Sequence, residues 1–359
     1  MTAVSVKREA QPVRLTQLDA LRGVAALMVV FFHYTSRFAE VYPHQPQSGL
    51  RFDIGEFGVD FFFILSGFVI FLSLQRCSSV WEFARLRFWR LFPVYWAAVL
   101  FSAAMIWLLD APGQAEGLDV PVVVLNLAMV HQFFYVPNVD GVYWTLAYEF
   151  AFYVWAACLY FIVPKRFTEW LLVAYVALAA GLTLFARQRG VEVPYRLTMA
   201  LMLDYAQLFS AGIVLYHVRS AGLTWTRGAM LVFFVLVEGY MHGLSAMIVT
   251  TLVVLMILEV LRGRLRWLNT PVMLFFGAIS YSLYLVHQSF GHSLMFHLGN
   301  AGVPAPLAAL LALVLSIAVA ACLTYLIERP VLRRVRRGRN AGRTRQAPRR
   351  VIRRFASES

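Results

Sequence analysis

Two polar side chains stand in an otherwise apolar stretch near the N-terminus, DALRGVAALMVVFFHYT, residues 19–35. Arg22 and His33 are eleven positions apart, and eleven residues of an α-helix turn through about 1100°, roughly 20° beyond three full turns. Both side chains therefore share one face of the predicted helix, about 16 Å apart along its axis. A groove along that face would hold an anion at the arginine and a base at the imidazole. A histidine that only hydrogen-bonds a neighbouring helix is the alternative.

An arginine-rich stretch provides a second set of candidates. FARLRFWRLFPVYW, residues 83–96, carries Arg85, Arg87 and Arg90 just before Pro93. The planar guanidinium makes paired, charge-assisted hydrogen bonds to phosphate oxygens, so this cluster suits a phosphorylated ligand. Arginines that only anchor a helix end at the cytoplasmic membrane surface are the alternative.

Three further stretches place polar side chains in apolar surroundings. GVDFFFILSGFVI, residues 58–70, carries Asp60 near its start and Ser66 and Gly67 in its middle, where small residues let a helix or a ligand come close. YWTLAYEFAFY, residues 143–153, places Trp144 at a membrane interface and Glu149 about 7 Å deeper by helical rise. FGAISYSLYLVHQ, residues 276–288, carries His287.

Four more acidic residues lie in apolar stretches, and structural roles can account for them. Glu238, Glu259 and Glu328 stand near predicted helix ends, where we expect them to reach water. Asp204 lies deeper, and a neighbouring arginine is a candidate partner.

The elements that must position these residues are membrane helices. The chain is 60% hydrophobic and only 14% charged, about half the charge of a soluble domain, and its apolar runs approach the ~20 residues of a spanning helix. The fold class is therefore predicted as an all-α, polytopic integral membrane protein. About ten spans are expected, at residues 18–38, 57–75, 89–109, 144–163, 168–186, 197–217, 228–242, 244–261, 271–297 and 305–328. Residues 120–134 are expected to form an interfacial or half-inserted helix rather than another span.

Charge distribution predicts the orientation of these spans. If the N-terminus is cytoplasmic, 27 of the 32 Lys and Arg residues fall on the cytoplasmic side, so the positive-inside rule places both termini there. No cleavable signal peptide is expected.

Three parts of the chain are expected. Residues 1–14 form a cytoplasmic segment, 15–332 the membrane domain, and 333–359 a basic, disordered tail that anionic headgroups attract. Nucleic-acid binding by this tail is not expected, because it has no stacking aromatic before Phe355. No metal site is expected either.

Six motifs in one order resemble the acyltransferase 3 family, membrane O-acyltransferases of bacterial surface glycans. They are the Arg-x10-His first helix, GVDFFFILSGF, RFWRLFPVYW, YWTLAYEF, ISYSLYLVH and YLIERP, and they span roughly residues 15–332. The resemblance implies transfer of an acyl group, usually acetyl from acetyl-CoA, to a hydroxyl at the outer face of the bacterial cytoplasmic (inner) membrane.

The resemblance also implies roles for individual residues. It makes Arg22 and His33 essential, gives importance to Arg87 and Arg90, and brings in Glu149 as the glutamate of the fourth helix. Two departures from the family pattern are noted. The additional hydrolase-like domain of some members is not expected here, and the Thr-Leu-Ala-Tyr run before Glu149 differs from the commoner tryptophan-serine-leucine sequence.

Residues and resemblance lead to one mechanistic hypothesis. Arg22, Arg87, Arg90 and their neighbour Arg85 hold the CoA phosphates, and His33 deprotonates the acceptor hydroxyl or carries the acyl group itself. Glu149 orients the imidazole or binds the acceptor, and Asp60, Ser66, Trp144 and His287 line the acceptor side. The acceptor is a glycan or lipid-linked saccharide.

A transporter or flippase of a saccharide or acyl compound is the rival function, because intramembrane His, Glu and Arg also build proton relays. Its sequence sign would be inverted repeats or paired broken helices, and the sequence offers neither.

Overall fold

Every regular element of the protein is helical over residues 15–337, the part of the chain that the computed structural model describes. The longer helices are α1 (Thr16–Phe32), α3 (Gly58–Leu74), α4 (Val80–Leu109), α6 (Trp144–Ile162), α7 (Lys165–Arg189), α9 (Ala206–Ala221), α10 (Trp225–His242), α11 (Leu244–Leu261), α12 (Pro271–Asn300) and α13 (Ala305–Leu323). Short helices and turns join them: η1 (His33–Arg37), α2 (Phe38–Val41), η2 (Asp53–Phe57), α5 (Val120–Asn126), η3 (His131–Phe134), η4 (Gly141–Tyr143), α8 (Tyr195–Ala200), η5 (Arg266–Asn269) and η6 (Thr324–Glu328). The expected segment 1–14 and residues 338–359 of the expected tail lie outside the described residues.

Seven helical segments within residues 15–337 are long and apolar enough to cross a membrane. They are Thr16–Val41, Asp53–Leu74, Val80–Leu109, Gly141–Ile162, Lys165–Arg189, Leu244–Leu261 and Ala305–Arg337. The other three predicted spans correspond to α9, α10 and α12, which are helical but are not among these seven. The all-helical, multi-pass prediction is therefore confirmed, while the number ten and the orientation stay predictions. The last helix continues to Arg337, into the predicted tail.

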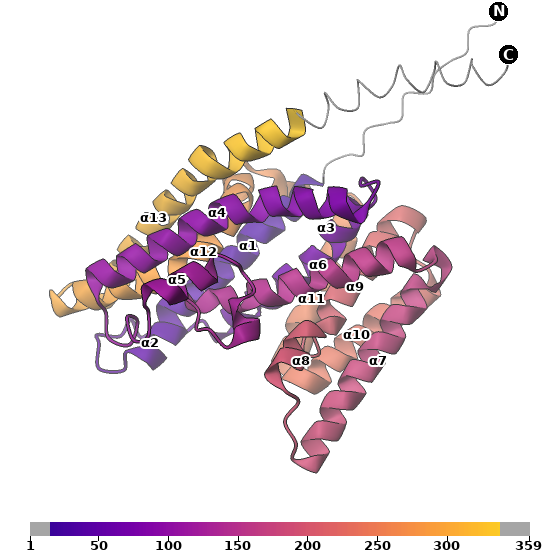
Figure 1. Ribbon diagram of the computed structural model, residues 1–359, viewed down its shortest axis with the longest axis horizontal. Coiled ribbons are helices and arrows are strands. Elements are labelled where there is room, and N and C mark those ends of the chain that lie inside the picture. Colours follow the sequence, from indigo (N-terminus) through magenta and orange to yellow (C-terminus); the bar gives the residue numbers. More distant parts are fainter. Residues whose placement is uncertain (1–14, 338–359) are drawn as a thin grey trace, which may run out of the picture.

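The helices form two packed groups that α3 connects. In the first group, α1, α4 and α13 pack on α12, and in the second, α7, α10 and α11 pack on α9. Helix α3 contacts α1 in the first group and α9 in the second, and α6 packs beside it. Figure 1 shows α5 and α13 towards one end of the molecule and α7, α8 and α10 towards the other, with α4 running along the upper side. Residues from both groups can therefore meet around α3 and α6.

Glycines permit the closest helix crossings. Gly23 of α1 faces Gly277 of α12, and a Cβ added to Gly23 would lie 2.5 Å from the Gly277 amide nitrogen. Gly67 of α3 faces Gly212 of α9 in the same way, which confirms that the small residue predicted in the second span allows close helix packing. The α1–α12 crossing matters most for the site, because His287 lies on α12 and His33 directly follows α1, at the start of η1.

Two predicted helix boundaries are wrong. The third span begins at Val80 instead of residue 89, because Ser79 caps the helix and accepts a hydrogen bond from the Glu82 amide at 3.2 Å. The arginine-rich segment is therefore part of helix α4. The sixth predicted span is broken between α8 and α9, and Met202 in the break has a φ of 48°.

Two turns of π-helix interrupt the regular spans. They are η1, which begins at His33, and η6, which ends at Glu328. A π-turn shifts the hydrogen-bond register of a helix and occurs frequently at functional sites. The two turns bring polar side chains to opposite ends of α1, His33 at one end and Glu328 near the other.

Candidate active site

Three histidines form a cluster where α1 ends against the middle of α12. The Nε2 atom of His287 lies 3.2 Å from Nδ1 of His33, and the two ring centroids are 4.9 Å apart. His292 approaches from the next turn of α12, and its Nε2 donates to the backbone carbonyl of His33 at 2.9 Å. The fold thus brings together two residues that the sequence placed in separate motifs, His33 and His287, and adds His292.

Hydrogen bonds fix which nitrogen of each neutral ring carries the proton. Nδ1 of His287 lies 2.9 Å from the carbonyl oxygen of Tyr284, and because a carbonyl only accepts, Nδ1 is the donor. The other nitrogen of His287, Nε2, is then an acceptor. Nδ1 of His33 faces this acceptor and the Val29 carbonyl oxygen, at 2.8 Å, and so carries the proton of its ring. The lone pair of His33 Nε2 remains, and no described residue hydrogen-bonds to it.

Tyr34 ties this cluster to a third helix. Its hydroxyl donates to the backbone carbonyl of His287 at 2.8 Å and lies 2.8 Å from the Ser316 hydroxyl of α13. The tyrosine follows His33 inside the π-turn η1 and is buried. Helices α1, α12 and α13 are therefore held in a fixed relation around the His33 imidazole.

The arginines gather at the opposite end of α1. Arg87 lies within electrostatic range of both Arg22 and Arg90. Its guanidinium is 5.5 Å from the Phe83 ring, and its buried Nε has no hydrogen-bond partner among the described residues. Arg85 is exposed, and the structure does not bring it into this group. We call Arg22, Arg87 and Arg90 the arginine group.

Two carboxylates border the arginine group. Arg90 forms an ion pair with Glu328 of η6. Glu149 lies within electrostatic range of Arg87 and accepts hydrogen bonds from Ser66 Oγ at 3.0 Å and from Tyr153 OH at 2.6 Å. Within residues 15–337 Glu149 makes no hydrogen bond to His33, whose imidazole is oriented by Val29 and His287 instead.

Two of the three glutamates predicted to reach water near helix ends are buried instead. Glu328 is 4% exposed and paired with Arg90, and Glu238 is fully buried and accepts a hydrogen bond from Gln207 at 2.6 Å. Contrary to the prediction, neither carboxylate reaches water, because a neighbouring helix covers each of these helix ends. Glu259 pairs with Arg262 and Arg264 at the surface, as expected.

Asp60 and Trp144 lie apart from the histidines. Asp60 stands in the first turn of α3 and Trp144 at the start of α6. Neither hydrogen-bonds to His33, His287 or His292 within the described chain. They belong to a different group of side chains on α3, α6, α9 and α10.

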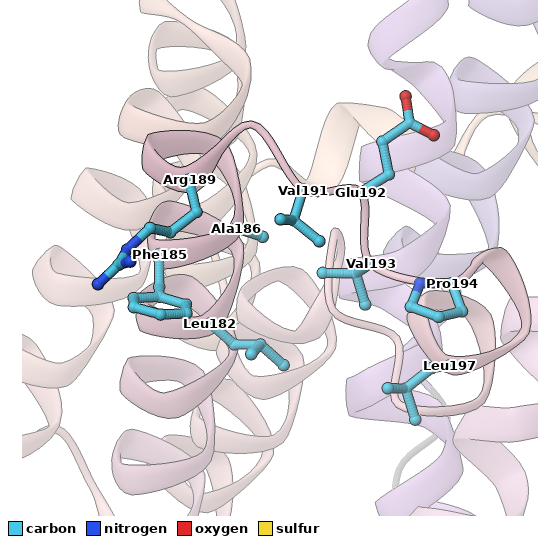
Figure 2. A pocket seen from close by; sticks show the side chains of 9 residues that line it. All are labelled: Leu182, Phe185, Ala186, Arg189, Val191, Glu192, Val193, Pro194 and Leu197. Atoms are coloured by element: carbon cyan, nitrogen blue, oxygen red, sulfur yellow. The ribbon is translucent and has the colours of Figure 1, made fainter.

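One cavity lies apart from both clusters. It has a volume of about 540 Å³ and lies between the end of α7 and the segment that leads into α8. Figure 2 shows Leu182, Val191 and Val193 directed into this space. Its lining is mostly apolar, so it offers no chemistry to compare with that of the histidine cluster.

Several residues of the clusters were not predicted from the sequence. Tyr34 and Tyr153 lie within quoted motifs but were not singled out, and His292 lies outside them. His292 is five positions from His287, a spacing that does not share a helix face. The run of polar residues Ser289, His292 and Ser293 in an apolar helix was the available signal.

Comparison with known proteins defines the class of this membrane protein. A family model described as an acyltransferase domain matches residues 15–325. The chain therefore belongs to the acyltransferase 3 family, in agreement with the resemblance of its motifs.

Two bacterial proteins are similar to this chain at the level of sequence. The exopolysaccharide production protein ExoZ of Rhizobium meliloti (strain 1021) is 32% identical over 328 residues, which cover 81% of this chain and 93% of that protein. The acyltransferase MdmB of Streptomyces mycarofaciens is 32% identical over 161 residues, which cover 43% of this chain and 41% of that protein. No solved structure matches the chain.

Proposed function

We propose that the protein transfers an acetyl group from acetyl-CoA to a saccharide hydroxyl at the outer face of the bacterial inner membrane. The observation that carries this proposal is the free lone pair of His33 Nε2, held by His287 and Val29 at the opposite end of α1 from the arginine group. The name of ExoZ supports a polysaccharide acceptor. The orientation of the spans rests on the positive-inside rule.

The arginine group is the proposed donor site. Three guanidinium groups face two carboxylates, Glu149 and Glu328, so the group keeps a positive charge that suits CoA phosphates. Arg87 has an unused buried donor, which a phosphate oxygen would satisfy. Arg90 is already paired with Glu328 and acts in support of Arg87 and Arg22.

His33 is the proposed general base. Its Nε2 accepts the proton of the acceptor hydroxyl while the hydroxyl oxygen bonds to the carbonyl carbon of the donor thioester. The carbon–sulfur bond then breaks, and the imidazolium returns the proton to the leaving CoA thiolate. The Nδ1–H bonds to Val29 and His287 hold the imidazole in the tautomer that this step requires.

The test is an acetyl-transfer assay in proteoliposomes, with acetyl-labelled acetyl-CoA and a chemically deacetylated exopolysaccharide. We expect His33→Ala to lower kcat by about 10²–10⁴-fold, the usual contribution of a general base, without a change in the KM for acetyl-CoA. The control is His44→Ala. It removes an exposed histidine that follows the same end of α1 as His33 does. Transfer at the normal rate by His33→Ala would overturn the assignment. Saccharide flux without acetyl transfer would favour a transporter.

A further inference from the structure

A second group of polar side chains lies where α3, α6, α9 and α10 meet. Its carboxylates are Asp60, Asp204 and Glu238, and its rings are Trp144, Tyr205 and His242. Tyr205 lies within electrostatic range of all three carboxylates. We call these six residues the acidic aromatic cluster.

The carboxylate of Asp60 is buried without a partner. Asp60 is 7% exposed, and among the described residues it forms neither a hydrogen bond nor an ion pair. Its charged neighbours within the cluster include Glu238, a second carboxylate, which repels it. A buried polar group without a partner is costly, so Asp60 indicates a ligand that donates hydrogen bonds.

A second polar atom next to the cluster is also unused. Gln207 of α9 donates through Nε2 to Glu238 at 2.6 Å and to the Asp204 carbonyl at 2.7 Å. Its Oε1 is buried and has no partner among the described residues. Glu238 in turn accepts from Nδ1 of His242 at 2.9 Å. The floor of the cluster is therefore rigid and rich in hydrogen-bond acceptors.

Aromatic rings form the more accessible side of the cluster. The Tyr205 ring lies parallel to the His242 ring, with centroids 5.5 Å apart and an angle of 9° between the planes. The Trp144 ring lies 5.7 Å from Tyr205, and the Tyr148 hydroxyl donates to Asp204 at 3.2 Å. Trp144, Asp204 and Tyr205 are all partly exposed. Flat rings beside carboxylates offer apolar contact and strong acceptors to the same ligand.

One residue connects this cluster to the histidines. Tyr284 of α12 lies within electrostatic range of Tyr205, and its ring centroid is 5.9 Å from that of His287. Its hydroxyl contacts Thr145 Oγ1, next to Trp144, at 2.8 Å. The cluster also gathers the first turns of α3 and α6, the start of α9 and the end of α10, which alternating crossings place on the side where α1 ends. A ligand bound there would adjoin His33.

We propose that the acidic aromatic cluster is the binding site for the acceptor, and that it selects an uncharged sugar unit over an anionic one. Sugar hydroxyls donate to the carboxylates and the ring faces contact the apolar side of the sugar, whereas an anionic sugar brings a like charge to Asp60, Asp204 and Glu238. The inference rests on the proposed acetyl transfer, because it names the substrate class of that same site.

The experiment compares matched neutral and anionic acceptors with the full-length protein in proteoliposomes. Methyl glucoside, galactoside and mannoside are each paired with the corresponding methyl uronide, which differs only by a carboxylate at C6. Acetyl-CoA consumption and labelled product are measured for each pair. We expect at least one neutral glycoside to be acetylated with a kcat/KM about tenfold or more above its uronide, the effect of one charged hydrogen-bonding contact.

Two variants assign this preference to the cluster. We expect Asp60→Asn to raise the KM for the neutral acceptor about tenfold and to narrow the neutral-to-uronide ratio, since it removes one of the repelling charges. The KM for acetyl-CoA should not change. The matched control is Asp53→Asn, an exposed aspartate nearby in the chain that contacts Arg51. A role of Asp60 in folding alone would lower activity with all acceptors and leave their ratio unchanged.

The outcomes separate this inference from the proposed function. If no CoA is released with any acceptor, including deacetylated exopolysaccharide, the acetyl transfer itself is refuted. If the uronides are acetylated with the same kcat/KM as the neutral glycosides, the proposed acetyl transfer stands and the acceptor inference is overturned. The wild-type comparison alone decides this, so the test does not depend on the stability of Asp60→Asn. A preference that persists unchanged in Asp60→Asn also contradicts the assignment to the cluster.

Discussion

The arginine group and the histidine cluster lie at opposite ends of α1 and use their hydrogen-bonding capacity in opposite ways. In the histidine cluster, Nδ1 of His287 and Nδ1 of His33 are both engaged by backbone carbonyls, at 2.9 Å and 2.8 Å. In the arginine group, Arg87 keeps a buried donor without a partner among the described residues, and Arg90 is held by a single carboxylate. In the histidine cluster the protein itself satisfies the Nδ1 donors of His33 and His287, whereas in the arginine group the Arg87 Nε donor has no partner among the described residues.

This difference separates two tasks of an enzyme. A base needs one orientation and one tautomer, which backbone carbonyls supply because they cannot change their protonation. A site for a phosphorylated donor needs charge that the protein itself leaves uncompensated. Substitutions should therefore change the rate in the first region and the affinity for the donor in the second.

The largest effect on activity is expected from substitutions in the histidine cluster. We expect His287→Leu to lower kcat about 10²-fold, near the lower end of a general-base contribution, with an unchanged KM for acetyl-CoA. His287→Gln should recover part of the rate, because its side-chain oxygen can accept the Nδ1–H of His33. Steady-state kinetics in proteoliposomes measure both. Equal losses in the two variants would show that His287 acts only by packing.

Substitutions in the arginine group should change the affinity for acetyl-CoA. We expect Arg87→Ala to raise the KM for acetyl-CoA about tenfold, the value of one charged hydrogen bond, while kcat changes little. The KM of Arg87→Lys for acetyl-CoA should lie between those of wild type and Arg87→Ala, since lysine keeps the charge and loses the planar guanidinium. Arg85→Ala is the control, because Arg85 is exposed and outside the group. A change in kcat alone would contradict a donor-binding role.

A smaller effect is expected at the ion pair between Arg90 and Glu328. Glu328→Ala leaves Arg90 next to two other arginines without its partner, and we expect a loss of thermal stability of several degrees. The double variant Arg90→Met with Glu328→Met should recover much of the loss, because breaking a pair costs more than replacing it with apolar side chains. Thermal unfolding in detergent checks both. An unchanged melting temperature of Glu328→Ala would show that the pair is not structural.

The smallest effect concerns Asp140, which precedes the spanning segment Gly141–Ile162. Burial raises the pKa of its carboxyl to about 6, while hydrogen bonds from the amides of Ser289 and Val142 oppose this shift. Because the folded-state pKa lies above the unfolded value, the protonated form favours folding, and stability should increase as the pH falls from about 7 towards 4.

The measurement is thermal unfolding at several pH values between 7 and 4. The slope with pH should be smaller in Asp140→Asn than in wild type, and the exposed Asp110→Asn should keep the wild-type slope. If Asp140→Asn also keeps the wild-type slope, the Asp140 carboxyl does not take up a proton in this range.

Much of the helical framework could be predicted because hydropathy and spacing are local properties. The shared face of Arg22 and His33 follows from helical rotation alone, and the apolar runs mark most of the spans. The start of α4 at Val80 could also have been predicted, since Ser79 followed by Glu82 is a capping signal. The break before α9 was not, because its residues 201–205 contain no glycine or proline.

The partners of the site residues could not be predicted, because they depend on contacts between distant segments. The contact of His33 with His287 joins residues 254 positions apart, and that of Tyr34 with Ser316 joins residues 282 apart. Helical rise predicts similar depths for Glu149 and His33, but depth does not determine which helix faces lie together. Glu149 therefore lies with the arginine group, although the same pattern allowed it to orient the imidazole.

The ion pair between Arg90 and Glu328 has a consequence for biosynthesis. The two residues are 238 positions apart, and at about 5–20 residues per second a ribosome needs roughly ten to fifty seconds to add the second after the first. During that interval Arg90 stands beside other arginines in a growing chain that lacks its counter-charge. The proposed donor site would be completed only when the segment that carries Glu328 is in place, so we expect a chain truncated before Glu328 to enter the membrane without being able to bind acetyl-CoA.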